Sequence, residues 1–265
     1  MISGVESAHL KVIRADQHID ALKAILRDAT GDDSYKIIKD ANGKETVEFV
    51  GSLAPDIAVL IGEILYQFRS ALDHLAFDLV KLNAGKIQFP VNWEERCSFP
   101  LKLKPPKGIP KPPVPYGHES FNVLPAISKE AFTFIESVQP YYRRPGTSNV
   151  LRLVAQLSNI DKHRHLNVTI RKAAIRQHLK LASGAVFTYG RGGLKHGAEI
   201  DPVATHYKAD DIVDVQRSVA SYVTFDEPTV GKGTDSLEVE HVLEVCGKEI
   251  KSIIIPAFTH FLQNP

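Results

Sequence analysis

Apolar residues recur at helical spacing in two long segments near the N-terminus. The first segment runs from Val5 to about Ala29. The second runs from Asp56 to about Asn83 and follows Pro55, which suits the first turn of a helix. At about 100° per residue, one stripe of the second segment comprises Ile61, Ile64, Leu65, Phe68, Leu72, Leu75 and Leu79. This stripe must face a core, so we predict a fold organised around a long central helix.

This helix has a second side that is also apolar, which predicts burial on two faces. The residues on that side are Tyr66, Phe77, Val80, Arg69, Ser70 and Asp73. Arg69 and Asp73 are four residues apart, the spacing of an intrahelical ion pair, and His74 lies about 140° around the helix from Arg69. One interpretation is a structural ion pair with His74 at its edge. The other is a dimer or substrate surface whose chemistry these three residues provide.

The period of the pattern changes in two other parts of the chain. Residues from Ser34 to Val50 alternate around Asn42-Gly43, which predicts a β-hairpin with a tight turn. After His165, four segments are β-branched or alternating and predict an antiparallel sheet. These segments are residues 166–175, 179–189, 218–225 and 237–245.

Shorter helices complete the predicted elements. They are expected from Ser128 to Val138, from Thr147 or Ser148 to Ile160, and from Lys248 to Leu262 with a bend at Pro256. The fold class that follows is α+β: a helical bundle around a long central helix with an N-terminal β-hairpin and a C-terminal antiparallel sheet.

We expect two parts that pack as one unit. Residues 1–165 would form the helical bundle with the hairpin as an insertion, and residues 166–265 the antiparallel sheet plus the C-terminal helix. A Pro-rich loop is expected at 84–127, with prolines separated by lysines between Pro100 and Pro115. It is either an ordered loop packed over the bundle or a polyproline II ligand for a partner domain.

Composition favours a cytoplasmic protein that does not enter the membrane. Hydrophobic residues make up 43% of the 265 residues, enough for a full core. Cys97 and Cys246 provide no disulfide framework and suit a reducing compartment, so we interpret both as free thiols. Charged residues interrupt the first 19 residues, so these residues lack the continuous apolar core that a secretory signal needs. The late apolar run, residues 253–258, is too short to cross a bilayer.

Charge is distributed unevenly along the chain, although the net charge is only +1. Between Arg96 and Ala198, 17 Lys and Arg stand against four Asp and Glu, so this middle segment carries +13 and the rest of the chain −12. One interpretation is a surface for an anionic partner such as RNA. The other is that the basic middle and the acidic flanks neutralise one another in the fold.

A second group of ionisable residues follows the short helix expected to end near Ile160. If this helix continues, Asp161, Arg164 and His165 extend its apolar stripe and are partly buried. If it stops, the basic side chains beyond it, such as Lys162, only favour the negative C-terminal end of the helix.

Three short sequences carry a resemblance. Residues 67–75 read QFRSALDHL, residues 139–141 read QPY, and residues 159–164 read NIDKHR. In this order they resemble a widespread family of uncharacterised bacterial proteins that share an LRSALDHL-type helix and a DKHR motif. The resemblance covers about residues 5–165 and implies no function.

The spacing of Arg69 and His74 also resembles the Arg-x4-His motif of HEPN-domain proteins, helical bundles that include metal-independent ribonucleases of toxin and defence systems. Where those proteins usually have a polar residue after the arginine, this chain has Ser70. The resemblance implies that Arg69 stabilises a phosphate and His74 handles the proton of an attacking 2′-hydroxyl.

This hypothesis names two sets of residues. The candidate catalytic residues are Arg69, His74, Asp73 and Asp161. The candidate RNA-binding residues are Lys162, Arg164, Arg143 and Arg144. The expected partners are RNA and a second copy of the chain, which would form a homodimer through the Tyr66/Phe77/Val80 face; no cofactor is expected.

Two other classes of function are compatible with the sequence. The first is a non-enzymatic binding or regulatory protein in which a buried network fixes the fold, formed by Arg69, Asp73, Asp161 and His74. The second is a metal-dependent helix-bundle hydrolase, because His74 with Asp78 and Asp161 with His165 are each four apart. Such pairs are common, so we assign no metal ligands.

Overall fold

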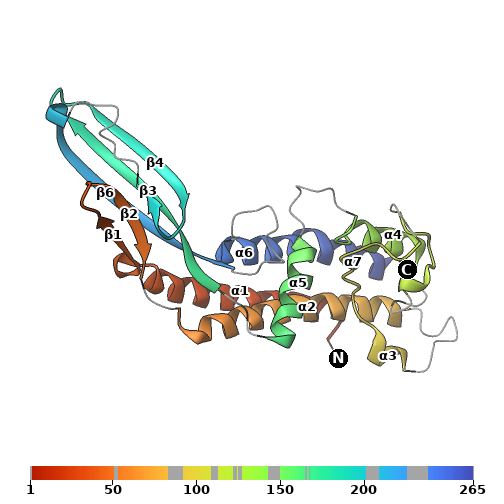
Figure 1. Ribbon diagram of the computed structural model, residues 1–265. Coiled ribbons are helices and arrows are strands. Elements are labelled where there is room, and N and C mark those ends of the chain that lie inside the picture. Colours follow the sequence, from red (N-terminus) through yellow and green to blue (C-terminus); the bar gives the residue numbers. More distant parts are fainter. Residues whose placement is uncertain are drawn as a thin grey trace. The chain divides into compact units, whose positions relative to one another are not determined.

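The structure is a computed structural model that describes most of the chain (Figure 1). The described residues are 2–50, 53–82, 92–108, 113–121, 124, 127–142, 150–164, 166, 168–200, 209–225 and 238–264. The chain combines helices with two antiparallel sheets, so the α+β class is confirmed.

Two long helices form where the first two helical patterns lie. They are α1, Gly4–Ala29, and α2, Pro55–Lys81. The two helices run antiparallel, since Ser7 of α1 contacts His74 of α2, whereas His18 lies 3.8 Å from Glu63. The predicted apolar stripe of α2 is buried: Ile61, Ile64, Leu65, Phe68, Leu72, Leu75 and Leu79 are all at most 2% exposed.

The predicted hairpin is also confirmed. Its strands are β1, Tyr35–Lys39, and β2, Glu45–Phe49, which pair antiparallel. Gly43 has φ = 82°, a conformation that favours glycine, and the Asp40 carboxylate accepts hydrogen bonds from the backbone N–H of Asn42 and Lys44. A short strand, β5 (Ala198–Glu199), pairs with β2 and completes a three-stranded sheet.

A second antiparallel sheet has the strand order β4-β3-β6. Its strands are β3, Val168–Leu181, β4, Val186–Leu194, and β6, Ile212–Phe225. The expected break between residues 175 and 179 is wrong, because β3 continues to Leu181 and the turn comes at Ser183-Gly184, where Gly184 has φ = 86°. The two sheets pack through a buried cluster of Val47, Ala173, Ile175, Leu194 and Ile200.

The C-terminal segment contains the main error of the sequence prediction. The strand expected at 237–245 is helix α6, Val239–Glu249, and Cys246 therefore lies in a helix. Its buried apolar residues recur at helical spacing and are Val239, Val242, Leu243 and Cys246. A π-helical turn, η5 (Ile250–Ile254), joins α6 to α7, Ile255–Gln263. Pro256 lies in the first turn of α7, where a missing N–H is tolerated.

The remaining helices are short. They are α3, Trp93–Arg96, α4, Lys129–Ser137, α5, Val150–His163, and the 3₁₀ turns Asp32–Ser34, Glu119–Phe121 and Ala209–Asp211. Ser128 caps α4 as predicted, because its hydroxyl accepts a hydrogen bond from the N–H of Ala131 at 3.2 Å. The expected caps of α5 at Thr147 and Ser148 lie outside the described residues, as do Arg143 and Arg144.

The chain divides into two compact units. The helical unit contains residues 1–21, 59–166 and 241–265, and the sheet unit contains residues 22–58 and 167–240. The structure thus groups the hairpin with the C-terminal strands, and the last helices with the bundle, whereas the sequence suggested a division near residue 165. In the described part of the chain, no helix is both long and apolar enough to span a membrane.

Candidate functional site

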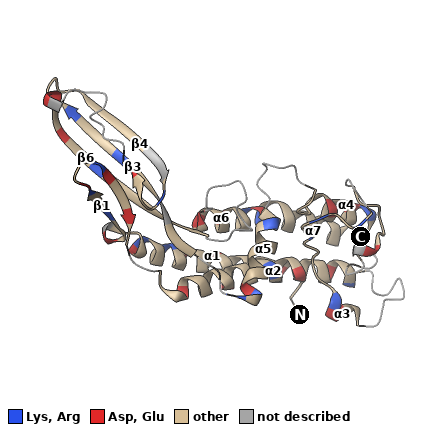
Figure 2. Cartoon of the chain, viewed as in Figure 1, with Lys and Arg blue, Asp and Glu red and all other residues tan. Residues whose placement is uncertain are grey.

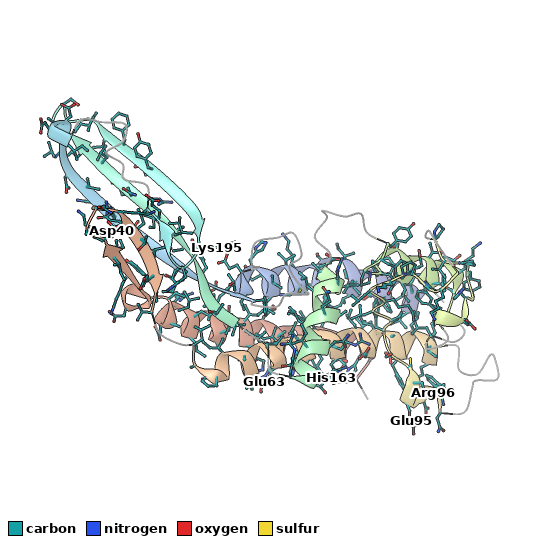
Figure 3. The ribbon with its side chains drawn as sticks, viewed as in Figure 1. Asp40, Glu63, Glu95, Arg96, His163 and Lys195 are labelled. Carbon is teal, nitrogen blue, oxygen red and sulfur yellow. The ribbon has the colours of Figure 1, made fainter. Side chains whose placement is uncertain are left out.

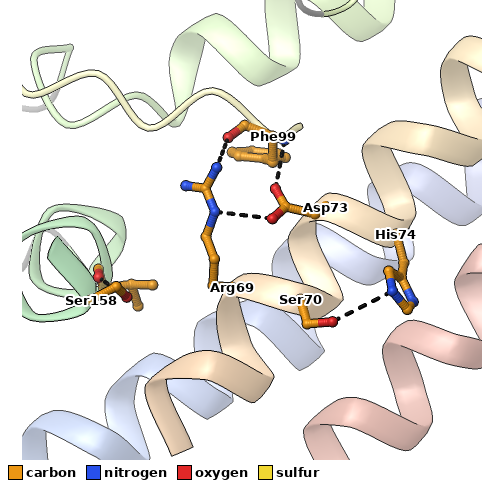
Figure 4. Close-up of polar contacts among 7 residues, drawn as sticks. Arg69, Ser70, Asp73, His74, Phe99 and Ser158 are labelled. Carbon is orange, nitrogen blue, oxygen red and sulfur yellow. Dashed lines mark hydrogen bonds and ion pairs between the residues drawn. The ribbon is translucent and has the colours of Figure 1, made fainter. Parts of the chain in front are cut away.

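Arg69 and Asp73 enclose the backbone of Phe99 (Figure 4). The Arg69 Nε donates to Asp73 Oδ2 at 3.2 Å, and another guanidinium nitrogen donates to the Phe99 carbonyl at 2.8 Å. The Phe99 N–H in turn donates to Asp73 Oδ1 at 2.8 Å. Both polar groups of one peptide segment are therefore bound by one helical turn of α2. We call Arg69, Asp73 and Phe99 the α2 clamp.

The α2 clamp holds a buried aromatic side chain in place. Phe99 is fully buried, and its ring lies 5.9 Å from that of Phe258 on α7. The side chains of Arg69 and Asp73 are 22% and 31% exposed, so water screens this ion pair only in part. Burial, and to a lesser degree the Asp73 charge, raises the pKa of the nearby Cys97 thiol to about 12. Cys97 is thus a protonated thiol at neutral pH.

His74 makes its contacts on another side of α2. Its Nδ1 is hydrogen-bonded to the Ser7 hydroxyl of α1 at 2.6 Å, and its Nε2 lies 3.4 Å from the Ser70 hydroxyl. In Figure 4 the imidazole points away from the carboxylate of Asp73. The structure therefore brings Arg69 together with Asp73, and His74 together with serines, but the two groups serve different neighbours.

The start of α1 fits closely against the same part of α2. The Gly4 N–H donates to the Asp78 carboxylate, and a Cβ at Gly4 would lie 2.5 Å from the carbonyl oxygen of His74. Glycine is needed here because the two helices approach so closely. Asp78, which the metal hypothesis paired with His74, thus accepts a hydrogen bond from the N-terminal end of α1, where a negative charge is favourable.

Asp161 lies against a different part of α2. A Cβ at Gly62 would lie 2.6–2.8 Å from the carboxyl group of Asp161, so this carboxylate occupies the space that the glycine leaves. Seven residues, about 10 Å along the helix axis, separate Gly62 from Arg69. The helix α5 continues past Ile160 to His163, but Asp161, Lys162 and Arg164 are exposed, so the expected partial burial of Asp161 and Arg164 is wrong. Figure 3 shows His163 at this end of α5. His165 lies outside the described residues.

The three residues of the expected dimer face have different environments. Tyr66 is 63% exposed and lies under the ammonium group of Lys11, whereas Val80 is fully buried. Phe77 stacks on Trp93, with ring centroids 5.4 Å apart. These residues do not form one exposed apolar face.

A second polar site was missed by the sequence analysis. Glu136 at the end of α4 is 2% exposed, and its Oε1 accepts from the Val114 N–H at 3.1 Å and from the Tyr141 hydroxyl at 3.4 Å. Burial raises the pKa of this carboxyl although both hydrogen bonds oppose the rise. Gln139, also buried, accepts from the Lys102 N–H at 3.0 Å.

These bonds fasten the described parts of the Pro-rich segment to α4, as one of the two interpretations of that segment predicted. In the sequence, Glu136 and Gln139 stand one helical turn apart before a proline, and this spacing was the available sign that their side chains bind the same neighbouring segment. The polyproline dipeptide at 112–113 falls largely outside the described residues.

Comparisons with known proteins do not name a family for this chain. No protein-family model, curated protein or solved structure matches it. Among the residues that the structure describes, no group of three or more His, Cys, Asp and Glu side chains could hold a metal ion. The function must therefore be inferred from the contacts of the residues themselves.

Proposed function

We propose that this chain binds an anionic partner without cleaving it, and that Arg69, Asp73 and His74 stabilise its fold. The observation that carries the proposal is the α2 clamp. A guanidinium that already donates to a carboxylate and to a backbone carbonyl has a structural task, because removing it would leave buried polar groups unsatisfied.

His74 supports the same proposal. Both of its ring nitrogens face hydroxyl groups of the chain itself, Ser7 on α1 and Ser70 on α2. The contact with Ser7 joins the two long helices beside the bond between Gly4 and Asp78. A histidine in this setting links α1 to α2 and needs no substrate to satisfy its polar atoms.

The distribution of basic residues supports an anionic partner. The segment from Val168 to Leu194 contains five Lys and Arg and no Asp or Glu. In the helical unit, Lys162 and Arg164 are exposed at the end of α5. Charges arranged in this way attract a polyanion through its phosphates or carboxylates.

The ribonuclease hypothesis is the alternative to this proposal. It requires Arg69 to contact a phosphate and His74 to reach a 2′-hydroxyl of the same nucleotide. Arg69 already uses two of its five N–H groups for Asp73 and Phe99, and His74 would have to exchange its bond to Ser7 for a bond to RNA. The proposal avoids this exchange.

A cleavage assay separates the two functions. Purified full-length protein is incubated with labelled single-stranded and structured RNAs, with and without divalent metal, and the products are resolved on gels. We expect intact RNA, and we expect Arg69→Ala to lower the midpoint of thermal unfolding. Cleavage that disappears in a folded His74→Ala variant would overturn the proposal and establish the ribonuclease.

A further inference from the structure

The β4-β3-β6 sheet has two faces of opposite character. Alternate residues of β3, including Ala173, Ile175 and Leu179, are buried, and the first two pack against the β1-β2-β5 sheet. Because successive side chains of a strand point to opposite sides, the residues between them lie on the other face. These residues are Arg176, His178 and Lys180. We call them the β3 column.

The surroundings of Arg176 leave its charge accessible. Its partners in register are Gly190 on β4 and Ser218 on β6, neither of which is acidic. A Cβ placed at Gly190 would meet nothing within 4 Å, so the space beside Arg176 is open. Arg176 is exposed, and it has no ion-pair partner among the described residues.

The other two members of the β3 column differ in their neighbours, which are polar and uncharged for His178 and include an acidic residue for Lys180. His178 lies between Thr188, which it contacts at 2.9 Å through Nδ1, and Gln216. Lys180 is exposed and lies between Val186 and Asp214. Asp214 is the one acidic residue in register with the column, and it stands at the column's far end.

The charge of this face comes from one hairpin. The strands β3 and β4 contain no acidic residue, and Figure 2 shows blue positions along β3. Lys195, which directly follows β4, adds another exposed cation to the same unit (Figure 3). In antiparallel strands every second residue is about 6.8 Å further along. The three side chains therefore form a straight row about 14 Å long.

We propose that the β3 column binds the phosphate backbone of a single-stranded nucleic acid lying along β3. This inference rests on the proposed function, because it names the anionic partner and its surface. A single strand presents its phosphates in one line, as the column presents its cations. A basic groove or surface that follows the backbone binds single strands with little dependence on sequence.

The flanking residues favour a nucleic acid over an acidic protein. Protein interfaces depend on buried aromatic and apolar anchors. Beside the column, the residues in register are mainly small or polar: Thr188, Gly190, Gln216 and Ser218, with Val186 as the exposed apolar exception. Backbone phosphates need only cations, which Arg176 and Lys180 supply, and hydrogen-bond donors, which the neighbouring hydroxyl and amide groups supply.

The test measures binding of full-length protein to fluorescein-labelled 20-nucleotide single-stranded RNA and DNA by anisotropy, at 50–200 mM salt. A duplex and a poly-glutamate peptide serve as competing ligands. We expect R176E/K180E to weaken single-strand binding roughly tenfold at the lowest salt and to reduce the salt slope by about 1.4, since each lost phosphate contact removes about 0.7. The neutral R176Q/K180Q variant loses the same two contacts, so it should reduce the salt slope equally, but its loss of affinity should be smaller because it adds no repulsion.

The matched control is K36E/K39E on β1, which changes the net charge equally at two exposed lysines of the same unit. It should bind like the unaltered protein. Equal weakening by both reversals, or no single-strand binding at the lowest salt, would overturn the inference, and preferred binding of poly-glutamate would show that the partner is an acidic protein. RNA recovered after each titration is checked for cleavage. Cleaved RNA would contradict the proposed function, which is binding without cleavage, independently of where the RNA binds.

Discussion

Arg69 in the helical unit and Arg176 in the sheet unit have opposite surroundings. Arg69 donates to Asp73 and to the Phe99 carbonyl, and its side chain is only 22% exposed. Arg176 is exposed beside Gly190 and Ser218, with open space next to it. The charge of Arg69 is bound by groups of the chain itself, whereas the charge of Arg176 is accessible to solvent. The charge of Arg69 has an acidic partner within the chain, whereas no acidic residue is in register with Arg176.

The local sequence contains the reason for this difference. Asp73 stands four residues after Arg69, the distance at which helical side chains meet. Around Arg176 the neighbours on β3 and β4 include no acid, and strand pairing places uncharged residues at both sides. Arg69 thus has an acidic partner on its own helix, whereas an acidic partner for Arg176 would have to stand on a neighbouring strand.

The largest expected effect comes from breaking the α2 clamp. Asp73→Ala removes the acceptor for both Arg69 and the Phe99 N–H, so two partly buried donors lose their partner. We expect a loss of about 2 kcal/mol in the free energy of unfolding. Urea denaturation followed by circular dichroism measures it.

Two variants serve as controls for this measurement. Glu63→Ala on the same helix removes a carboxylate that is 54% exposed and 3.8 Å from His18, and its cost should stay within about 0.5 kcal/mol. Asp73→Asn keeps an oxygen for the Phe99 N–H and should recover part of the stability. Equal losses for Asp73→Ala and Glu63→Ala would refute a structural role of the α2 clamp.

The local elements of the fold could be predicted from the sequence. Asn42-Gly43 located the hairpin because glycine at a positive φ is the requirement of that turn, and the apolar stripe of α2 was read correctly. The pattern at 237–245 was misread because a short apolar run fits both periods. This segment forms the helix α6, and packing decides between the two periods. For example, a Cβ built on Gly247 would lie only 3.3 Å from the ring of Phe68.

The candidate site could be predicted only in part. The pairing of Arg69 with Asp73 followed from their spacing, and it is confirmed. The third member, Phe99, lies 26 residues beyond Asp73 and is bound through its backbone, which no side-chain pattern reveals. Asp161 likewise meets Gly62 across two helices. Contacts of this kind depend on how helices pack, and a single sequence does not specify that.

A second test asks whether Asp161 also serves the helical unit internally. Gly62→Ala in a helix interior normally stabilises by about 1 kcal/mol. Here the added methyl group would displace the Asp161 carboxylate, so we expect no gain in the unaltered protein. In the Asp161→Ala background the gain should appear. A double-mutant cycle of unfolding free energies measures the coupling, and additive effects would show that Asp161 does not contact α2 in solution.

A third test concerns the buried acid at the end of α4. Because burial raises the pKa of Glu136, the folded state holds this proton more tightly than the unfolded state. Stability from this group is therefore present at low pH and is lost as the pH rises from about 4.5 through the raised pKa. Glu136→Gln should remove this dependence and should not destabilise the protein at pH 7. The unfolding midpoint is compared between pH 4.5 and 8, with Glu130→Gln on the same helix as control.

The smallest expected effect belongs to the exposed cation. Arg176→Ala leaves no described acceptor without its donor, so the free energy of unfolding should change by no more than about 0.5 kcal/mol. Arg69→Ala, the same substitution in the helical unit, leaves the Phe99 carbonyl without its donor and removes one of the two donors to Asp73, so it should cost at least about 1 kcal/mol. Equal costs measured by urea denaturation would contradict the difference between the two arginines. A small cost for Arg176→Ala combined with weaker nucleic-acid binding would show that this charge serves the ligand rather than the fold.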